Sequence, residues 1–488
     1  FPGNLVILLR AVLQNQAAAK RLRRYKTLVF SSLLFLFRFL PITFLIYYLV
    51  PFRLKNTVLF LASLFFYTWG EPKFFPIMLI SIGVNYIAGL LMEKYDDRPK
   101  VRRVCFWSAF AVTLGFLLFF KYTNFFLSNI NGLFGLDLPL LSSDVFHLPL
   151  GISFYTFQIL AYTIDVYKRK IKVEHNLIDF GAFVVLFPQL IAGPIVLYSD
   201  INKELKSRKI TLAQIEEGVG LFIMGLGSKI LLADTIGALW SEVQMIGFSN
   251  ISTPLAWLGV LVYSFQIYFD FSGYSLMAIG LGRMLGFYFP QNFNYPYISK
   301  SITEFWRRWH ITLSSWFREY VYIPLGGNRV KKSRHFFNLF VVWFLTGFWH
   351  GANWNFIFWG LYFFVLLMIE KTFLLKHLEK SKVLSHIYLI FFVMISWAIF
   401  GISDLSVLGE LFARMFSAVG GTDWLYYLRD YAGVLILCVL ASTPFFKTAA
   451  NTVGKNKIVR TVFLSAVLLI SIAFMVDSTY SPFLYFNF

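Results

Sequence analysis

Residues 336–373 read FFNLFVVWFLTGFWHGANWNFIFWGLYFFVLLMIEKTF, a run of 38 mostly apolar residues. Because a helix needs only about 20 apolar residues to cross the hydrocarbon core of a bilayer, this run is nearly two crossings long and has to break. The expected break is Gly351-Ala352-Asn353, where the glycine weakens a helix and Asn353 can cap the next one. The sequence therefore predicts two helices with His350 at the junction between them, inside the membrane.

The rest of the chain has the composition of an integral membrane protein. Of the 488 residues, 58% are hydrophobic and only 14% are charged, whereas soluble domains carry about 25% charged residues. Apolar runs span 29–51, 57–70, 74–92, 104–128, 150–166, 178–199, 214–240, 253–288, 336–373, 387–403, 431–446 and 458–478. A transmembrane β-barrel would show short alternating segments instead. We predict an all-α polytopic membrane protein with about 11 transmembrane helices, plus interfacial and re-entrant helices.

Basic residues give the chain a net charge of +19, a property that many nucleic-acid-binding proteins share. They lie, however, in short clusters between the apolar runs, at 20–26, 98–103, 168–172, 203–209, 329–334 and 447–460. Basic clusters at loop ends mark the cytoplasmic face of a membrane and attract anionic lipids. We therefore expect the lipid bilayer as the partner of these clusters, and we expect no nucleic acid.

Domain organisation and metal content can also be predicted. Residues 1–28 form a polar, basic stretch before the first strong apolar run, and we expect an N-terminal extension there that is not part of the fold. Residues 29–488 then form one membrane domain. Cys105 and Cys438 both lie in apolar runs, so they predict neither a disulfide framework nor a metal site. The histidines show no metal-binding spacing, and no metal is expected.

His350 is the strongest candidate for chemistry. A neutral imidazole can move protons near pH 7, and an ionisable side chain at membrane depth is usually functional. As a general base, His350 would take the proton from an acceptor hydroxyl while that oxygen attacks a thioester carbonyl. The N-terminus of the next helix, near Asn353, could stabilise the negative oxygen that develops. The alternative is a packed, fully hydrogen-bonded histidine without a chemical role.

A second histidine lies in EFWRRWHITLSSWFREYVYIPLGGNR (304–329). Because this mixture of charges and aromatic residues is unsuited to spanning lipid, we predict a helix at the interface or packed into the protein, ended by the Pro-Leu-Gly-Gly turn. His310 either binds an anion, orients the other histidine, or lies at the interface with its polar edge in water. Arg307, Arg308 and Arg318 are candidates for binding the pyrophosphate of an acyl carrier, with lipid headgroups as the alternative.

The run 253–288 carries two ionisable residues, Asp270 and Arg283, and a glycine, Gly273, at which we expect the helix to weaken. We predict that Asp270 is structural and paired with an arginine or with backbone donors. Its alternatives are a role in substrate binding or in raising the basicity of a histidine. Near the end of the sequence, Tyr485 offers a hydroxyl that could accept an acyl group and pass it on.

Five stretches of the chain resemble motifs of a known family: PLGISFYTFQILAYTIDVY (149–167), FPQLIAGPI (187–195), QIYFDFSGYS (266–275), NFNYPYISKSITEFWRRWHITLSSWFREYVYIPLGGNR (292–329) and LTGFWHGANWNFIFWG (345–360). They resemble the membrane-bound O-acyltransferase (MBOAT) family, in particular its bacterial branch that acetylates alginate and peptidoglycan. The likeness covers residues 29–488. The resemblance implies a helical bundle around a central tunnel, with His350 as the catalytic histidine and His310 as the second signature histidine.

The same resemblance implies substrates, a partner and a location. The donor would be acetyl-CoA or an acylated carrier protein on the cytoplasmic side, and the protein would bind no cofactor. The acceptor would be an exported polysaccharide, with an SGNH-like acyltransferase outside the bacterial plasma (inner) membrane as the partner. A C-terminal motif like FLYFNF (483–488) would carry the acyl group on Tyr485. Leu197, where an arginine is common, and Leu276, where an aspartate is common, depart from the pattern, so the substrate stays open.

Two other functions remain open at this point. Asp270 and Arg283 at membrane depth also suit a transporter or flippase that moves an acyl donor or a lipid-linked sugar without covalent chemistry. A scaffold that only assembles an exopolysaccharide machine is the third option. We predict an O-acyltransferase, in the first place an O-acetyltransferase, that modifies hydroxyls of an extracytoplasmic polysaccharide or cell-wall polymer.

Overall fold

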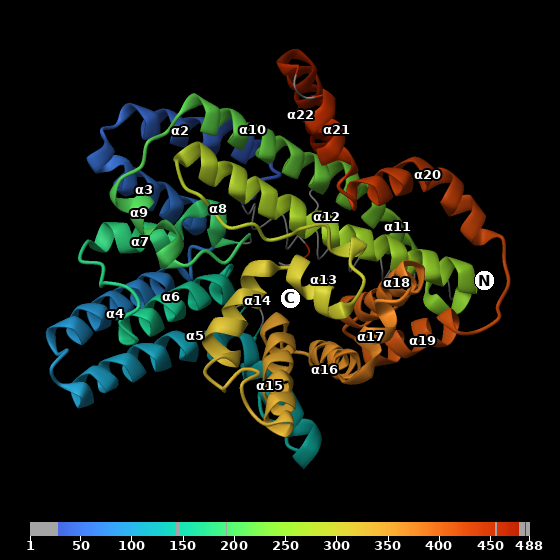
Figure 1. Ribbon diagram of the computed structural model, residues 1–488, viewed down its shortest axis with the longest axis horizontal. Coiled ribbons are helices and arrows are strands. Elements are labelled where there is room, and N and C mark those ends of the chain that lie inside the picture. Colours follow the sequence, from blue (N-terminus) through green and yellow to red (C-terminus); the bar gives the residue numbers. More distant parts are fainter. Residues whose placement is uncertain (1–27, 143–146, 192, 454–455, 478–483, 485–488) are drawn as a thin grey trace.

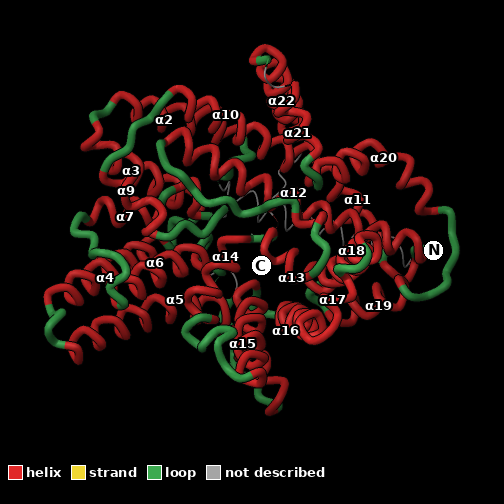
Figure 2. The backbone as a smooth tube through the Cα atoms, viewed as in Figure 1, coloured by secondary structure: helices red, strands yellow, loops and turns green. Residues whose placement is uncertain are grey.

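The computed structural model describes residues 28–142, 147–191, 193–453, 456–477 and 484. This part of the chain consists of helices joined by loops and contains no strand (Figure 2). The predicted all-α class is therefore confirmed. Of the predicted N-terminal extension, residues 1–27 lie outside the described residues, and Leu28 is buried in the core.

Eight helical stretches of the described chain are long and apolar enough to cross a membrane. They are α4 (Phe75–Lys94), α5 (Pro99–Phe134), α10 with η2 and α11 (Leu212–Ile246), α12 (Thr253–Leu285), α16 with η6 and α17 (Trp354–Leu378), α18 (Lys382–Gly401), α20 (Asp423–Ala441) and α22 (Lys457–Asp477). The chain is thus a multi-pass membrane protein. The predicted number of about 11 crossings requires shorter apolar helices as well, and Phe35–Leu49 is one of these.

The remaining helices are shorter or less apolar. They are η1 (Phe35–Phe39), α2 (Leu40–Leu49), α3 (Phe52–Gly70), α6 (Ile152–Tyr167), α7 (Leu177–Val185), α8 (Phe187–Leu190), α9 (Tyr198–Lys206), η3 (Phe248–Asn250), η4 (Pro296–Ile298), α13 (Ile302–Arg308), α14 (Ile311–Phe317), η5 (Arg318–Tyr322), α15 (Lys332–His350), α19 (Leu405–Met415) and α21 (Phe445–Val453). Within the composite stretches, α10 is Leu212–Gly227, η2 is Ser228–Asp234, α11 is Thr235–Ile246, α16 is Trp354–Ile369, η6 is Glu370–Leu374 and α17 is Leu375–Leu378. The apolar run 178–199 is therefore not one helix, because α7 ends before Pro188, and the four residues of α8, a loop and the first turn of α9 follow.

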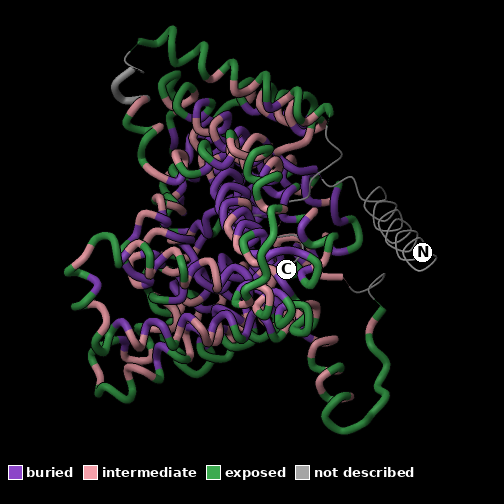
Figure 3. Tube along the Cα trace, turned by 90° about the vertical axis from the view of Figure 1, so that its right-hand side faces the viewer, coloured by how far each residue is buried: buried purple, intermediate pink, exposed green. Residues whose placement is uncertain are grey.

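Burial divides the apolar helices into internal and peripheral ones. α12 runs through the middle of the molecule with α10 beside it, and α22 lies at the edge (Figure 1). In the apolar window of α12, 83% of the residues are buried, against 17% for α20 and 6% for α22. Buried residues concentrate in the centre, and exposed ones follow the outer helices (Figure 3). Because the exposed residues of these outer helices are largely apolar, this surface fits lipid and not water.

Glycines bring α10 and α12 into backbone contact. A Cβ on Gly273 would lie 2.7 Å from the carbonyl oxygen of Gly225, and a Cβ on Gly280 would lie 2.5 Å from that of Gly218. Such small residues let membrane helices approach closely. The expectation that the helix weakens at Gly273 is therefore wrong, because α12 is continuous from Thr253 to Leu285 and the missing side chain serves packing between helices.

This contact predicts the effect of adding one methyl group. We expect Gly273→Ala to lower the free energy of unfolding by about 1–3 kcal/mol, because the new Cβ overlaps the α10 backbone. Gly433→Ala in α20 is the matched control, since a Cβ there meets nothing within 4 Å and alanine favours the helix. Thermal unfolding in detergent measures both variants. Equal stability of the two would contradict the packing role.

The long run 336–373 breaks where the sequence predicts. α15 ends at His350 and α16 begins at Trp354, whose backbone N–H donates to the Asn353 side chain at 2.7 Å. The two helices then pack against each other with Gly347 beside Gly360, where a Cβ on Gly347 would lie 2.3 Å from a backbone oxygen of α16. The predicted junction and its Asn353 cap are confirmed.

Candidate active site

His350 is the last residue of α15, and aromatic rings enclose its imidazole. The ring lies edge-to-face against Trp359 of α16 and Phe400 of α18, with ring centroids 5.0 and 5.2 Å apart, and against Trp349 at 5.1 Å. Only 4% of His350 is exposed. Three helices therefore hold this imidazole away from bulk water.

His310 lies at a kink between two short helices. α13 ends at Arg308 and α14 begins at Ile311, so the predicted helix is divided, although it packs into the protein as expected: Trp309 and His310 are buried. The φ angle of His310 is 41°, in the left-handed region that non-glycine residues rarely adopt. A strained backbone of this kind costs about 1–3 kcal/mol and is often found at functional sites.

Asn292 determines which nitrogen of His310 carries the proton. Its side-chain oxygen Oδ1 accepts hydrogen bonds from the backbone N–H and the hydroxyl of Thr312, at 3.3 and 2.9 Å, and lies 3.1 Å from His310 Nδ1. Because this oxygen accepts, Nδ1 has to donate, which leaves Nε2 with a lone pair. Nε2 is buried and has no hydrogen-bond partner in the part of the chain that the structure describes. Burial also lowers the pKa of His310, so the imidazole is neutral at physiological pH.

Trp349 connects the two histidines. Its ring centroid lies 6.3 Å from that of His310 and 5.1 Å from that of His350. Because 40 residues separate the two histidines along the chain, it is the tertiary fold that brings both of them to one tryptophan.

A small cavity reaches His350. Its wall is formed by His350 and Trp349, by Lys121 of α5, by residues 148–154 at the start of α6, and by Ile191. The cavity volume is about 70 Å³, and one water occupies about 30 Å³ in the liquid. The cavity thus admits two water-sized groups at His350.

Sequence reasoning missed Lys121. Its Nζ donates to the carbonyl oxygens of Trp349 and His350, at 2.5 and 3.1 Å, and lies 3.5 Å from Ser153 Oγ. The signal was present, because Lys121 is a lone cation in the apolar run 104–128 and ionisable residues at membrane depth are usually functional. Asn292 was missed as well, and an asparagine in a polar loop carries no comparable signal.

The sequence matches proteins of known class over nearly its whole length. Residues 165–408 match the family model of MBOAT, the membrane-bound O-acyltransferase family. The chain is 38% identical to the probable alginate O-acetylase AlgI of Pseudomonas putida, over 94% of this chain and 100% of that protein. It is 34% identical to the peptidoglycan O-acetyltransferase of Helicobacter pylori, over 95% of this chain and 98% of that protein. The chain belongs to the membrane-bound O-acyltransferase family.

This O-acyltransferase also resembles a protein that transfers an amino acid. It is 33% identical to the teichoic acid D-alanyltransferase of Streptococcus thermophilus, over 48% of this chain and 59% of that protein. The match to acyltransferases confirms the prediction of an enzyme, and it favours neither the transporter nor the scaffold. His310 and His350 fall inside the matched family region, whereas Lys121 and residues 148–154 precede it.

The three arginines of this O-acyltransferase do not line the cavity at His350. Arg307 and Arg318 are exposed. Arg308 pairs with Glu304, with both guanidinium contacts at 2.9 Å, and also donates to a backbone carbonyl of the preceding loop. The structure thus places none of the three arginines at the cavity beside His350. Their binding of a pyrophosphate stays a prediction.

Asp270 pairs with a lysine, and the prediction of an arginine partner is wrong. Lys229 Nζ lies 2.7 Å from Asp270 Oδ1, and the backbone N–H of Leu484 donates to Oδ2 at 2.8 Å. Backbone donation to Asp270 was correctly expected. Arg283 instead faces Glu217, at 3.6 Å, near the end of α12. Arg283 is too far away to be the partner of Asp270, because the two residues are 13 positions apart on one continuous helix, which is about 20 Å along its axis.

Tyr485, the predicted acyl carrier, lies outside the described residues, and its role stays a prediction. Leu484, directly before it, packs against the core and is the residue that donates to Asp270. Within the described residues, no group of three or more histidine, cysteine, aspartate or glutamate side chains could hold a metal ion.

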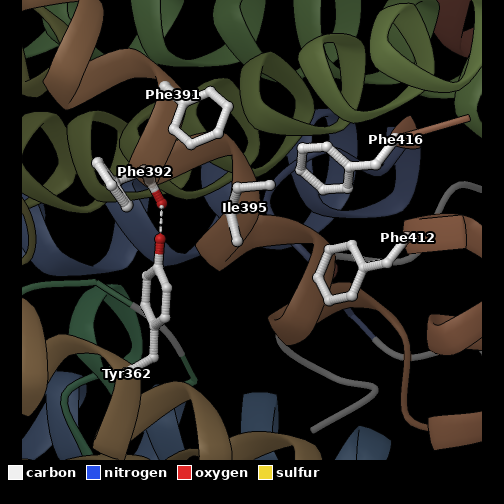
Figure 4. A pocket seen from close by; sticks show the side chains of 6 residues that line it. All are labelled: Tyr362, Phe391, Phe392, Ile395, Phe412 and Phe416. Atoms are coloured by element: carbon white, nitrogen blue, oxygen red, sulfur yellow. Dashed lines mark hydrogen bonds between the residues drawn. The ribbon is translucent and has the colours of Figure 1, made fainter. Parts of the chain in front are cut away.

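A larger cavity lies elsewhere, between α16, α18 and α19 (Figure 4). Its volume is about 290 Å³, and Tyr362, Phe391, Phe392, Ile395, Phe412 and Phe416 line it. The Tyr362 hydroxyl donates to the backbone carbonyl of Phe392 at 2.9 Å. Because this lining offers no acid, base or cation, the smaller polar cavity at His350 is the better candidate for chemistry.

Proposed function

We propose that this membrane O-acyltransferase passes an acyl group, in the first place acetyl, from a cytoplasmic thioester to hydroxyls of an extracytoplasmic polysaccharide or cell-wall polymer. The donor is acetyl-CoA or an acylated carrier protein, and an SGNH-like acyltransferase completes the transfer outside the bacterial plasma membrane. Relatives named for acetylating alginate and peptidoglycan support an acetyl group and a polymer. The observation that carries the proposal is the cavity at His350.

The positions of two basic clusters indicate the side of the membrane from which the acceptor reaches the site. The basic clusters 98–103 and 168–172 lie at the start of α5 and just after the end of α6. Such clusters face the cytoplasm. α5 and α6 pack against each other, so residues 148–154, at the opposite end of α6, lie toward the extracytoplasmic face. We therefore expect the acceptor to reach the cavity from this side.

In the proposed reaction, His350 acts as the general base. The acceptor oxygen attacks the acyl carbon while its proton passes to the imidazole, a contribution of about 10²–10⁴ in rate. The aromatic rings around His350 keep bulk water out, which protects the thioester from hydrolysis. His310 does not line this cavity; its part in the proposal is to position Trp349, and through that ring His350.

The tautomer of His310 gives a prediction about Asn292. We expect Asn292→Ala to lower kcat by about tenfold or more, because His310 loses the acceptor that fixes its proton on Nδ1. Asn292→Asp keeps an acceptor and adds a negative charge, which favours the protonated imidazole and raises the pKa of His310. As the pH is lowered, the Asn292→Asp variant should therefore lose its activity at a higher pH than the wild-type protein does.

The measurement for this pair is kcat between pH 5 and 8 on protein reconstituted in vesicles. Thr312→Val is the control, because it removes the hydroxyl that donates to the same Asn292 oxygen and accepts from the Ile195 N–H, while the contact between Asn292 and His310 stays. If Asn292→Ala and Thr312→Val have the same small effect on kcat, then kcat does not depend on the tautomer of His310.

The experiment that tests the function uses the purified full chain in sealed vesicles. A labelled acetyl thioester is supplied on one side, and an acceptor polysaccharide with the extracytoplasmic partner fraction is supplied on the other. We expect ester-linked label on the polymer. Donor that crosses the vesicle membrane while no label becomes covalently bound would favour the transporter and overturn the proposal.

A further inference from the structure

Two lysines at membrane depth have different surroundings in this protein. Lys229 is paired with two carboxylates, Asp234 at 2.6 Å and Asp270 at 2.7 Å. Lys121 forms no ion pair with a carboxylate of the described residues, and its partners are two backbone carbonyls and a hydroxyl. A charge at membrane depth is expensive and is usually paired or functional. Ion pairing with carboxylates therefore explains why Lys229 is present at this depth, but it does not explain Lys121.

The hydrogen bonds of Lys121 leave one donor weakly used. An ammonium group has three N–H donors and no lone pair. Two of them reach the carbonyls of Trp349 and His350 at 2.5 and 3.1 Å, while Ser153 Oγ lies at 3.5 Å, beyond the usual range of about 2.7–3.2 Å. Ser153 also lines the cavity. The third donor is thus available to a ligand oxygen in the cavity.

Lys121 is also held in a fixed position. The two carbonyls that it contacts belong to the last two residues of α15, the negative end of the helix dipole. The ammonium lies 5.7 Å from the centroid of the Trp349 ring, which adds a cation–π contact. A positive charge that is fixed before the reaction stabilises a developing negative charge without a reorganisation cost.

We propose that Lys121 is a further catalytic residue, and that its ammonium binds the carbonyl oxygen of the acyl group as that oxygen becomes negative. This inference rests on the proposed function. The N-terminus of α16, which the sequence suggested for this role, is a poorer candidate, because residues 352–355 do not line the cavity and Lys121 does.

The reaction step balances without a further reagent. A bond forms between the acceptor oxygen and the acyl carbon, the hydroxyl proton passes to His350, and the carbonyl electron pair moves to the oxygen beside Lys121. The pair then returns to form the ester carbonyl, the carbon–sulfur bond breaks, and His350 returns the proton to the leaving thiolate. Lys121 keeps its own protons throughout.

The test compares two neighbouring residues that contact the same helix end. Lys121→Met removes the charge and keeps most of the side-chain volume. Tyr122→Phe removes the hydrogen bond from Tyr122 to the Phe348 carbonyl, at 2.6 Å, but Tyr122 does not line the cavity. We expect Lys121→Met to lower kcat by about 10²-fold with little change in KM for the donor, and Tyr122→Phe to change kcat less than about threefold. Equal effects of the two variants would overturn the inference.

Chemical rescue separates charge from folding. Lys121→Cys, in a chain with Cys105→Ala and Cys438→Ala, is treated with 2-bromoethylamine, which rebuilds a lysine-like ammonium, or with bromoethane, which adds volume without charge. We expect the amine alone to restore activity, and failure of both treatments, or rescue by both, would overturn the inference.

If His350→Ala is inactive while Lys121→Met is fully active, only the role of Lys121 falls. If both are fully active, the proposed function falls.

Discussion

Replacing His350 with alanine is expected to lower the rate of acyl transfer by about 10²–10⁴-fold. The acceptor hydroxyl would then lose the base that takes its proton, and no other histidine lines the cavity. The measurement is transfer of labelled acetyl to polymer by reconstituted protein. Affinity for the donor should change little, because the imidazole acts on the acceptor.

Two comparisons make this prediction specific. His377→Ala changes an exposed histidine of α17 whose Nδ1 contacts a backbone carbonyl of the preceding turn, that of Phe373, and it should leave the rate unchanged. His350→Gln retains more of the volume that Trp359 and Phe400 enclose, so it should fold like wild type and still be inactive. A stably inserted His350→Ala protein with wild-type activity would refute the mechanism.

Replacing Lys229 with methionine is expected to destabilise the protein by about 3–5 kcal/mol, because the buried Asp270 carboxylate loses its cation and the partly exposed Asp234 loses an ion pair. Only 2% of the Lys229 side chain and 2% of the Asp270 side chain are exposed. The pair connects η2 to α12, the most buried helix among the candidate spans. Thermal unfolding in detergent and the yield of folded protein measure the effect.

The control for Lys229 is a surface pair. Arg429 pairs with Asp430 at 2.9 Å, but 74% of the arginine side chain is exposed, so Arg429→Met should cost less than about 1 kcal/mol. Adding Asp270→Asn to Lys229→Met removes one uncompensated charge and should recover part of the lost stability. Wild-type stability of Lys229→Met alone would contradict the structural role of the pair.

Local features of the fold could be predicted because hydropathy and caps act over a few residues. The run 336–373 exceeds one crossing by its length alone, and Asn353 caps α16 as expected. Gly273 shows the limit of such reasoning. A glycine in a helix weakens it by propensity, yet here it permits contact with Gly225 of another helix, and the packing partner is invisible in the local sequence.

Candidate site residues divide in the same way. The two histidines were found because imidazoles among aromatic and apolar residues are unusual in any membrane segment. Asn292 and the lysine partner of Asp270 were not found, because hydrogen-bond and ion-pair partners come from segments far apart: Lys229 and Asp270 lie on different helices. Lys121 had a local signal, but its distance to His350 was needed to interpret it.

The sequence by itself determined a helical membrane protein, the break at His350 and the two histidines, because chain length, hydropathy and residue type are local properties. Only the tertiary structure decided that Trp349 joins the histidines, that Asn292 orients one of them and that Lys121 enters the cavity of the other. These relations depend on which helices pack together. Helix packing is decided by close contacts such as Gly225 against Gly273, which no local pattern specifies.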